Sequence, residues 1–127
     1  MTRQRVCILG STGSVGSNTL DVAGRHDERF EVFALTGARR VDELLAQCLR
    51  WQPRFAAMAD PASARDLRER LRDAGSRTEV LEGPQALVEL AAHPEVDVVM
   101  AAIVGAAGLP PCMSAARAGK RLLLANK

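Results

Sequence analysis

Residues 6–16 read Val-Cys-Ile-Leu-Gly-Ser-Thr-Gly-Ser-Val-Gly. The first four residues are apolar and partly β-branched, which favours a buried strand. Glycines follow at positions 10, 13 and 16, and apolar residues at helical spacing continue from Val15. The stretch therefore predicts a strand, a tight turn and a helix in direct succession, which is how a βαβ unit begins.

The rest of the chain repeats this alternation. Short apolar runs predict further strands at residues 30–35, 55–59, 78–81, 96–104 and 121–125. Apolar stripes with helical spacing predict helices that begin near residues 15, 41, 61, 84 and 110. In the first helix, the residues predicted to face inward are Val15, Thr19, Val22 and Ala23. Asp60-Pro61 is typical of a helix start, with the carboxylate as N-cap.

This pattern predicts an α/β fold formed by residues 1–127 as one domain. We expect a Rossmann-like, doubly wound parallel sheet of about six strands with helices on both faces. The expected strand order is 4-3-2-1-5-6, so the chain reverses direction beside the first strand. Ligands bind at such a reversal, which places the expected ligand crevice beside residues 10–16.

Composition excludes several classes of protein. A net charge of +2 gives no global argument for nucleic-acid binding. No apolar run is long enough to predict a membrane span. Cys7, Cys48 and Cys112 are odd in number and lack metal-ligand spacing, so we expect reduced thiols in a cytoplasmic protein.

The glycine-rich turn has the chemistry of a phosphate-binding loop. Gly10 permits a sharp exit from the strand, Gly13 lets a phosphate approach the backbone, and Gly16 lets the helix lie close to the sheet. Ser11 stands where the common dinucleotide fingerprint has its second glycine, and the hydroxyls of Ser11, Thr12 and Ser14 are expected donors to phosphate. A merely structural turn is the alternative, but the strand–turn–helix context favours a nucleotide.

The end of the second predicted strand indicates which nucleotide. NAD-preferring folds place a carboxylate there to bind the ribose 2′-hydroxyl, whereas this chain has Arg39 and Arg40. Guanidinium groups suit a 2′-phosphate, so the sequence favours NADPH. The alternative is two solvated arginines at a helix start.

No catalytic cluster or metal-ligand group stands out. His26 and His93 are both expected at the surface, and Asp97 is expected at the entry to the fifth strand. A cofactor-binding domain without its own catalytic site suggests that the chain is a fragment of a longer enzyme.

Longer segments carry a specific resemblance. The glycine loop with Asn18-Thr19-Leu20-Asp21-Val22, GSRTEVLEG at 75–83, MAAIVGAAGL at 100–109 and AGKRLLLANK at 118–127 resemble the 1-deoxy-D-xylulose 5-phosphate reductoisomerase family. The resemblance covers essentially the whole chain. It implies the N-terminal NADPH-binding domain of an enzyme that continues into a catalytic domain and a helical domain.

The resemblance implies an activity for the full-length protein. Family members rearrange 1-deoxy-D-xylulose 5-phosphate and reduce the product with NADPH to 2-C-methyl-D-erythritol 4-phosphate, an early step of non-mevalonate isoprenoid biosynthesis. They require Mg²⁺ or Mn²⁺, whose ligands would lie beyond Lys127. The substrate is a small phosphosugar, and the full-length protein is expected to be a homodimer. The fragment alone is predicted to be inactive.

The resemblance also implies site residues. Those matching the family's cofactor contacts are Thr12, Gly13, Ser14 and Val15 for the pyrophosphate, Ala38, Arg39 and Arg40 for the adenosine phosphate, and Asn126 near the nicotinamide. Lys127 matches a substrate-binding residue, and Ala102 and Ile103 are expected to line the nicotinamide site. Many members have Gly-Lys-Asn at 38–40, so this chain differs there while keeping positive charge.

Two other interpretations remain open from the sequence. One is the NADP-binding domain of another reductase with a similar loop, such as a semialdehyde dehydrogenase. The other is a non-catalytic nucleotide-sensing module.

Overall fold

Parallel strands form a single six-stranded sheet in the computed structural model, which describes residues 3–103 and 105–124. The strands are β1 (Gln4–Leu9), β2 (Phe30–Gly37), β3 (Phe55–Met58), β4 (Glu79–Glu82), β5 (Val98–Ala101) and β6 (Arg121–Leu124). Their order is β4-β3-β2-β1-β5-β6, and neighbouring strands pair in parallel. The predicted fold class and strand order are both confirmed.

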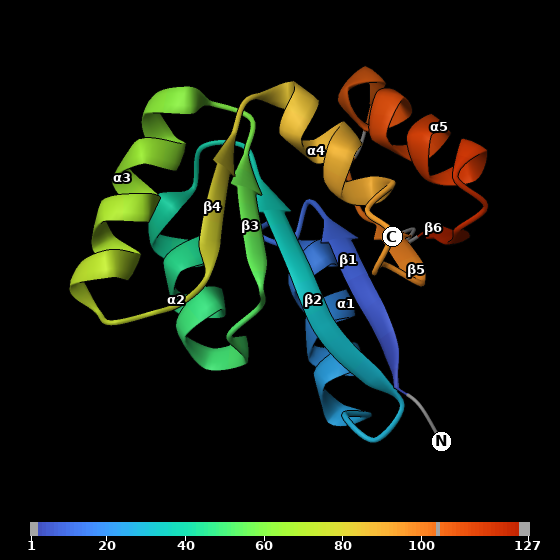
Figure 1. Ribbon diagram of the computed structural model, residues 1–127, viewed down its shortest axis with the longest axis horizontal. Helices are drawn as coiled ribbons and strands as arrows, with labels where there is room; N and C mark the ends of the chain where they lie inside the picture. Colours follow the sequence, from blue (N-terminus) through green and yellow to red (C-terminus); the bar gives the residue numbers. More distant parts are fainter. Residues whose placement is uncertain (1–2, 104, 125–127) are drawn as a thin grey trace.

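Helices cover both faces of this sheet (Figure 1). They are α1 (Ser14–Arg25), α2 (Val41–Trp51), α3 (Pro61–Asp73), α4 (Pro84–Ala91) and α5 (Leu109–Arg117), with a short 3₁₀ turn at Ala106–Gly108 before α5. The side chains of α1, α2 and α3 pack on one face of the sheet, and those of α4 and α5 pack on the other. Two aliphatic cores result, as expected for a parallel sheet that is buried on both sides.

The helix ends follow their capping residues. The carboxylate of Asp60 accepts a hydrogen bond of 3.0 Å from the backbone N–H of Ser63, and Pro61 occupies the first turn of α3. This confirms Asp60 as an N-cap. Gly75 follows the end of the same helix with a φ of +76°, a conformation that glycine adopts without strain.

The predicted inner face of α1 is confirmed at Ala23, half-buried at Val15 and Thr19, and wrong at Val22. Gly16, Leu20 and Ala23 are buried, whereas Val22 is 56% exposed. Close packing of Gly16 against the turn sets the rotation of the helix, and the apolar spacing alone did not reveal that contact.

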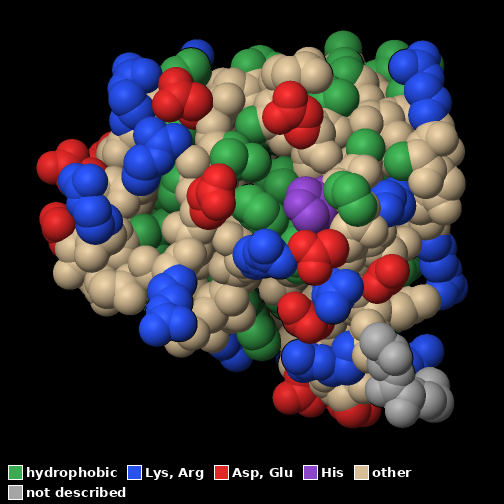
Figure 2. All heavy atoms as spheres, in the orientation of Figure 1, with side chains coloured by type: hydrophobic (Ala, Val, Ile, Leu, Met, Phe, Trp, Pro, Cys, Tyr) green, Lys and Arg blue, Asp and Glu red, His purple; other side chains and the backbone are tan. Residues whose placement is uncertain are grey.

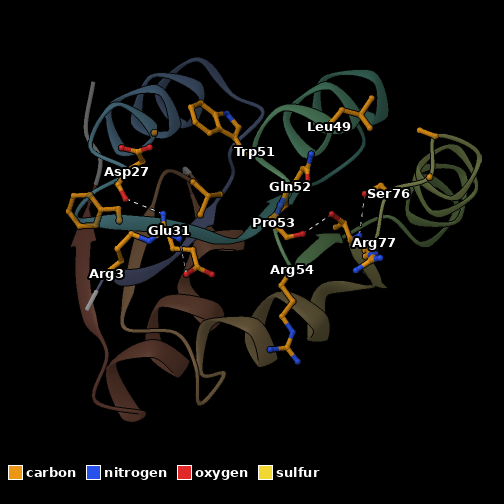
Figure 3. A pocket seen from close by; sticks show the side chains of 16 residues that line it. Arg3, Asp27, Glu31, Leu49, Trp51, Gln52, Pro53, Arg54, Ser76 and Arg77 are labelled. Carbon is orange, nitrogen blue, oxygen red and sulfur yellow. Dashed lines mark hydrogen bonds and ion pairs between the residues drawn. The ribbon is translucent and has the colours of Figure 1, made fainter. Parts of the chain in front are cut away.

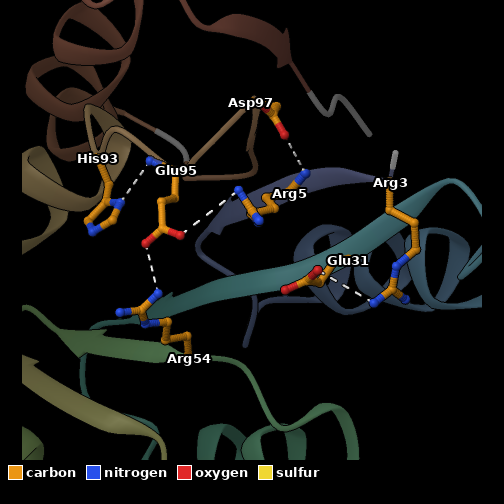
Figure 4. Close-up of polar contacts among 7 residues, drawn as sticks. All are labelled: Arg3, Arg5, Glu31, Arg54, His93, Glu95 and Asp97. Atoms are coloured by element: carbon orange, nitrogen blue, oxygen red, sulfur yellow. Dashed lines mark hydrogen bonds and ion pairs between the residues drawn. The ribbon is translucent and has the colours of Figure 1, made fainter. Parts of the chain in front are cut away.

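The fifth strand is shorter than predicted. Only Val98–Ala101 of the expected 96–104 pair as a strand, and Val104 lies outside the described residues. Asp97 stands at the entry as expected, where its carboxylate accepts a 2.8 Å hydrogen bond from the backbone N–H of Arg5 (Figure 4).

The two histidines differ in environment. His26 is exposed, as predicted. His93 is half-buried, so it is less exposed than predicted. Its ring centroid lies 5.2 Å from that of Phe33 and 5.3 Å from that of Phe55. Its Nδ1 accepts a hydrogen bond from the backbone N–H of Glu95, which gives the ring a structural role (Figure 4).

Candidate nucleotide-binding site

The glycine-rich turn lies at the carboxyl end of β1, where β1 passes directly into α1. Gly13 is the N-cap of α1, and no side chain caps this end of the helix. The first N–H groups of a helix have no acceptor within the helix, and its N-terminus carries partial positive charge. The first turn of α1 is therefore open to an anion.

The glycines of the turn serve different purposes. Gly10 has a φ of +79°, and a Cβ on Gly16 would overlap the carbonyl oxygen of Gly10. Both of these glycines are needed for the backbone to fold as it does. Gly13 has a φ of −76°, which any residue adopts, and the nearest atom to an added Cβ is the carbonyl oxygen of Gly10 at 3.9 Å. The packing of the protein does not require glycine at position 13.

Ser11 turns its side chain into the protein. It is fully buried, and its hydroxyl lies 2.7 Å from Oε1 of Gln47 and 3.2 Å from the carbonyl oxygen of Thr36. Its backbone N–H donates to the same Thr36 carbonyl at 2.9 Å, and the N–H of Gly10 donates to Oγ1 of Thr36 at 2.9 Å. The expectation that the Ser11 hydroxyl donates to phosphate is therefore wrong: this hydroxyl anchors the turn.

The loop between β2 and α2 lies against the glycine turn. A Cβ on Gly37 would be 3.3 Å from the side chain of Thr12, and Nη1 of Arg40 donates to the carbonyl oxygen of Thr12 at 3.3 Å. The structure thus brings together the two loops that the sequence singled out, residues 12–15 and 38–40. Asn126 and Lys127 lie outside the described residues.

The two arginines of this second loop have different surroundings. Nε of Arg40 lies 3.8 Å from a carboxylate oxygen of Glu43, so Arg40 contacts both its own helix and the glycine turn. Arg39 is exposed, and its positive charge interacts with the carboxylate of Asp60 at the start of α3. Hydrogen bonds from Ser63 lower the pKa of Asp60, and the positive charge of Arg39 lowers it further.

The third side of the site is formed by the segment after β5. The N–H of Ala102 donates to the carbonyl oxygen of Leu9, which continues the sheet to the edge of the turn. A Cβ on Gly10 would lie 2.9 Å from Cγ1 of Ile103. Ala102 and Ile103 are half-buried beside the turn, and their expected place at the nicotinamide stays a prediction.

The residues of this site offer no metal centre. Within residues 3–103 and 105–124, no three His, Cys, Asp or Glu side chains lie close enough to hold a metal ion. Over the same residues, no helix is long and apolar enough to cross a membrane. Side chains of both charges are interspersed over the face shown in Figure 2, which is the pattern of an ordinary hydrated surface.

A cavity of about 680 Å³ lies at the amino ends of the strands, opposite to the end that carries the glycine turn (Figure 3). It is lined by the residues that precede β3 and β4, including Trp51, Arg54 and Arg77. At one end of it, the guanidinium of Arg3 donates to the carbonyl oxygen of Asp27. Because parallel strands all run the same way, this cavity is separated from the glycine turn by the length of the sheet.

The parallel sheet with helices on both faces, and the glycine turn that leads into the uncapped N-terminus of α1, define a Rossmann-like domain. Comparison with known sequences is specific: the sequence model of the 1-deoxy-D-xylulose 5-phosphate reductoisomerase family matches residues 6–127. The chain belongs to this family, as the sequence resemblance predicted.

Individual sequences similar to this chain come from the same family. The chain is 64% identical over 124 residues to 1-deoxy-D-xylulose 5-phosphate reductoisomerase of Aromatoleum aromaticum, and 58% identical over 125 residues to that of Burkholderia multivorans. Each match covers 98% of this chain but 31% of the relative, so the chain spans about a third of the length of these proteins.

Solved structures share the fold closely. A structure of DOX-P reductoisomerase in complex with NADPH, fosmidomycin and magnesium superposes with a TM-score of 0.92 at 46% identity, covering 97% of this chain and 30% of that one. The Zymomonas mobilis enzyme in complex with NADPH gives a TM-score of 0.90 at 43% identity, covering 98% and 32%.

Proposed function

We propose that residues 1–127 form the NADPH-binding domain of a 1-deoxy-D-xylulose 5-phosphate reductoisomerase. The observation that carries this proposal is Gly13. Neither its φ nor its neighbours require glycine, yet a side chain there would project beside the uncapped N-terminus of α1. A glycine that the fold does not need is explained by a ligand that approaches the backbone, and a pyrophosphate is such a ligand.

Each part of the cofactor has candidate residues. Backbone groups of Thr12, Gly13, Ser14 and Val15 would hold the pyrophosphate at the start of α1. The adenosine 2′-phosphate would lie on the loop of Ala38, Arg39 and Arg40, where the end of β2 carries no carboxylate. Both arginines are exposed, and Arg40 in addition donates to the glycine turn. The sequence resemblance adds Asn126 for the cofactor and Lys127 for the substrate.

The activity proposed for the whole protein follows from the family. It would isomerise and reduce 1-deoxy-D-xylulose 5-phosphate to 2-C-methyl-D-erythritol 4-phosphate, with bound NADPH supplying the hydride. The relative solved with NADPH and magnesium supports NADPH and Mg²⁺ as cofactors, and the family resemblance adds Mn²⁺ as the alternative metal. The family resemblance assigns the metal ligands to a part of the longer relatives that residues 1–127 do not match. We further propose a homodimeric full-length protein in the cytoplasm, a location supported by the free cysteines.

Calorimetric titration of the chain with NADPH and with NADH tests this proposal. We expect NADPH to bind and NADH to bind at least about tenfold more weakly, which corresponds to about 1.4 kcal/mol. Equal affinities would contradict the role of Arg39 and Arg40, and no binding of either nucleotide would contradict the site itself. The chain is expected to turn over no 1-deoxy-D-xylulose 5-phosphate in the presence of NADPH and Mg²⁺.

A further inference from the structure

Gln47 of α2 makes a two-point contact with the glycine turn. Its Nε2 donates to the carbonyl oxygen of Ser11 at 2.8 Å, and its Oε1 accepts from the hydroxyl of Ser11 at 2.7 Å. The hydroxyl of Ser17 donates to the same carbonyl oxygen at 3.1 Å. Ser11 is fully buried, whereas Gln47 and Ser17 are half-buried, so these bonds are partly shielded from water.

The orientation of the Gln47 amide follows from its partners. A carbonyl oxygen only accepts hydrogen bonds, so the amide group that faces the Ser11 carbonyl is the NH₂ donor. The amide oxygen then faces the Ser11 hydroxyl. Both hydrogen-bonding functions of the side chain are thus used on one residue of the turn.

This contact has a consequence for the next peptide group. In a trans peptide, the carbonyl of one residue and the N–H of the following residue point in opposite directions. No cis peptide occurs in the described chain. Because Gln47 and Ser17 hold the carbonyl of Ser11 on the protein side, the N–H of Thr12 is directed away from them. Thr12 is the first of the residues to which we assigned the pyrophosphate.

We propose that Gln47 is a positioning residue for the dinucleotide: it fixes the Ser11–Thr12 peptide so that the glycine turn is preorganised for the pyrophosphate. This inference rests on the proposed function. Gln47 contacts the turn and not the nucleotide, so it acts through Ser11. Since α2 also begins at the loop that holds Arg39 and Arg40, one helix links the adenosine end of the site to its pyrophosphate end.

Two substitutions separate the parts of this contact. Gln47→Met keeps the length of the side chain and removes both hydrogen-bonding groups. Gln47→Glu keeps an acceptor for the Ser11 hydroxyl but cannot donate to the Ser11 carbonyl while ionised. Gln85→Met is the matched control, because Gln85 is an exposed residue of α4 on the other face of the sheet. Thermal unfolding of each variant measures any loss of stability.

Titrations with three ligands distinguish positioning from a general loss of structure. We expect Gln47→Met and Gln47→Glu to weaken NADPH and NADH by a similar factor of about ten, the equivalent of 1.4 kcal/mol. Adenosine 2′-monophosphate, which lacks the pyrophosphate, should bind with unchanged affinity, and Gln85→Met should change none of the three. Unchanged binding of NADPH to the folded Gln47 variants would overturn the inference. The inference would also be overturned if the Gln47 variants bound adenosine 2′-monophosphate more weakly by the same factor as NADPH. If the unsubstituted chain itself binds no NADPH, the proposed function fails instead.

Discussion

Gly16 packs so closely against Gly10 that a methyl group on Gly16 would overlap the carbonyl oxygen of Gly10. This relationship places the start of α1 directly over the end of β1. It explains why the buried stripe of α1 runs through Gly16 and Leu20. The same contact brings the N-terminus of the helix to the carboxyl edge of the sheet, which is where Rossmann-like folds bind their ligands.

The first prediction contrasts Gly16→Ala with Gly13→Ala. Gly16→Ala should lower the free energy of unfolding by about 2 kcal/mol or more, because backbone atoms must move to admit the methyl group. Gly13→Ala should leave stability nearly unchanged, since the added Cβ meets only one atom at 3.9 Å. It should nevertheless weaken NADPH binding. Urea unfolding and calorimetry measure the two effects, and full NADPH affinity in Gly13→Ala would argue against a phosphate at that position.

A second prediction concerns the two exposed arginines between β2 and α2. Arg39→Ala should reduce affinity for NADPH by about tenfold or more and leave affinity for NADH unchanged, as expected from the loss of a charge-assisted hydrogen bond worth roughly 1.5–3 kcal/mol. Arg40→Ala should weaken both nucleotides, because it also removes the contact with the carbonyl of Thr12. Competition titrations against NADPH and NADH report both ratios. A loss confined to NADPH in both variants would show that the contact with Thr12 does not matter for binding.

The third prediction tests the packing of α1 on α2. A Cβ on Gly24 would overlap the ring of Trp51. Alanine gains about 1 kcal/mol of helix propensity over glycine, but the displacement of a packed aromatic ring costs about 1–3 kcal/mol, so Gly24→Ala should be destabilising overall. Trp51 is the only tryptophan in the chain, so its fluorescence reports the movement directly. An unshifted emission spectrum with raised stability would show that the ring yields easily.

The fourth prediction concerns alkaline pH. Burial raises the pKa of the Cys7 and Cys48 thiols from 9.0 to about 12. The folded state therefore holds these protons more tightly than the unfolded state, and the resulting stability is complete below about pH 9 and lost as the pH rises toward 12. The urea midpoint should fall over this range. In Cys7→Ala/Cys48→Ala the fall should be shallower, and an identical slope would show that other groups control it.

The strand order could be predicted from sequence because it depends on local, repeated signals. Apolar runs alternate with helical stripes, and right-handed crossovers leave few ways to arrange them. Arg39 and Arg40 were also accessible to sequence reasoning, since their distance from the glycine turn along a βαβ unit is characteristic. The inward direction of Ser11 was not, because a serine in a loop turns either way until its neighbours are known. The role of Gln47 could not be predicted from sequence either, because a polar residue between Leu44 and Cys48 is what the border of an apolar helix face normally contains.

The sequence by itself determined the fold class, the family and the place of the glycine turn. Each of these can be recognised from short segments of sequence, without knowledge of contacts between distant residues. Only the tertiary structure decided what each residue of the turn does. It showed that Gly16 is required by the backbone of Gly10, that Gly13 is not required by packing, and that Ser11 is an anchor held by Gln47. The roles of Gly13 and Gly16 follow from the way the turn folds back on itself between β1 and α1, and the role of Ser11 follows from Gln47, which the fold brings to the turn from 36 residues away in the chain.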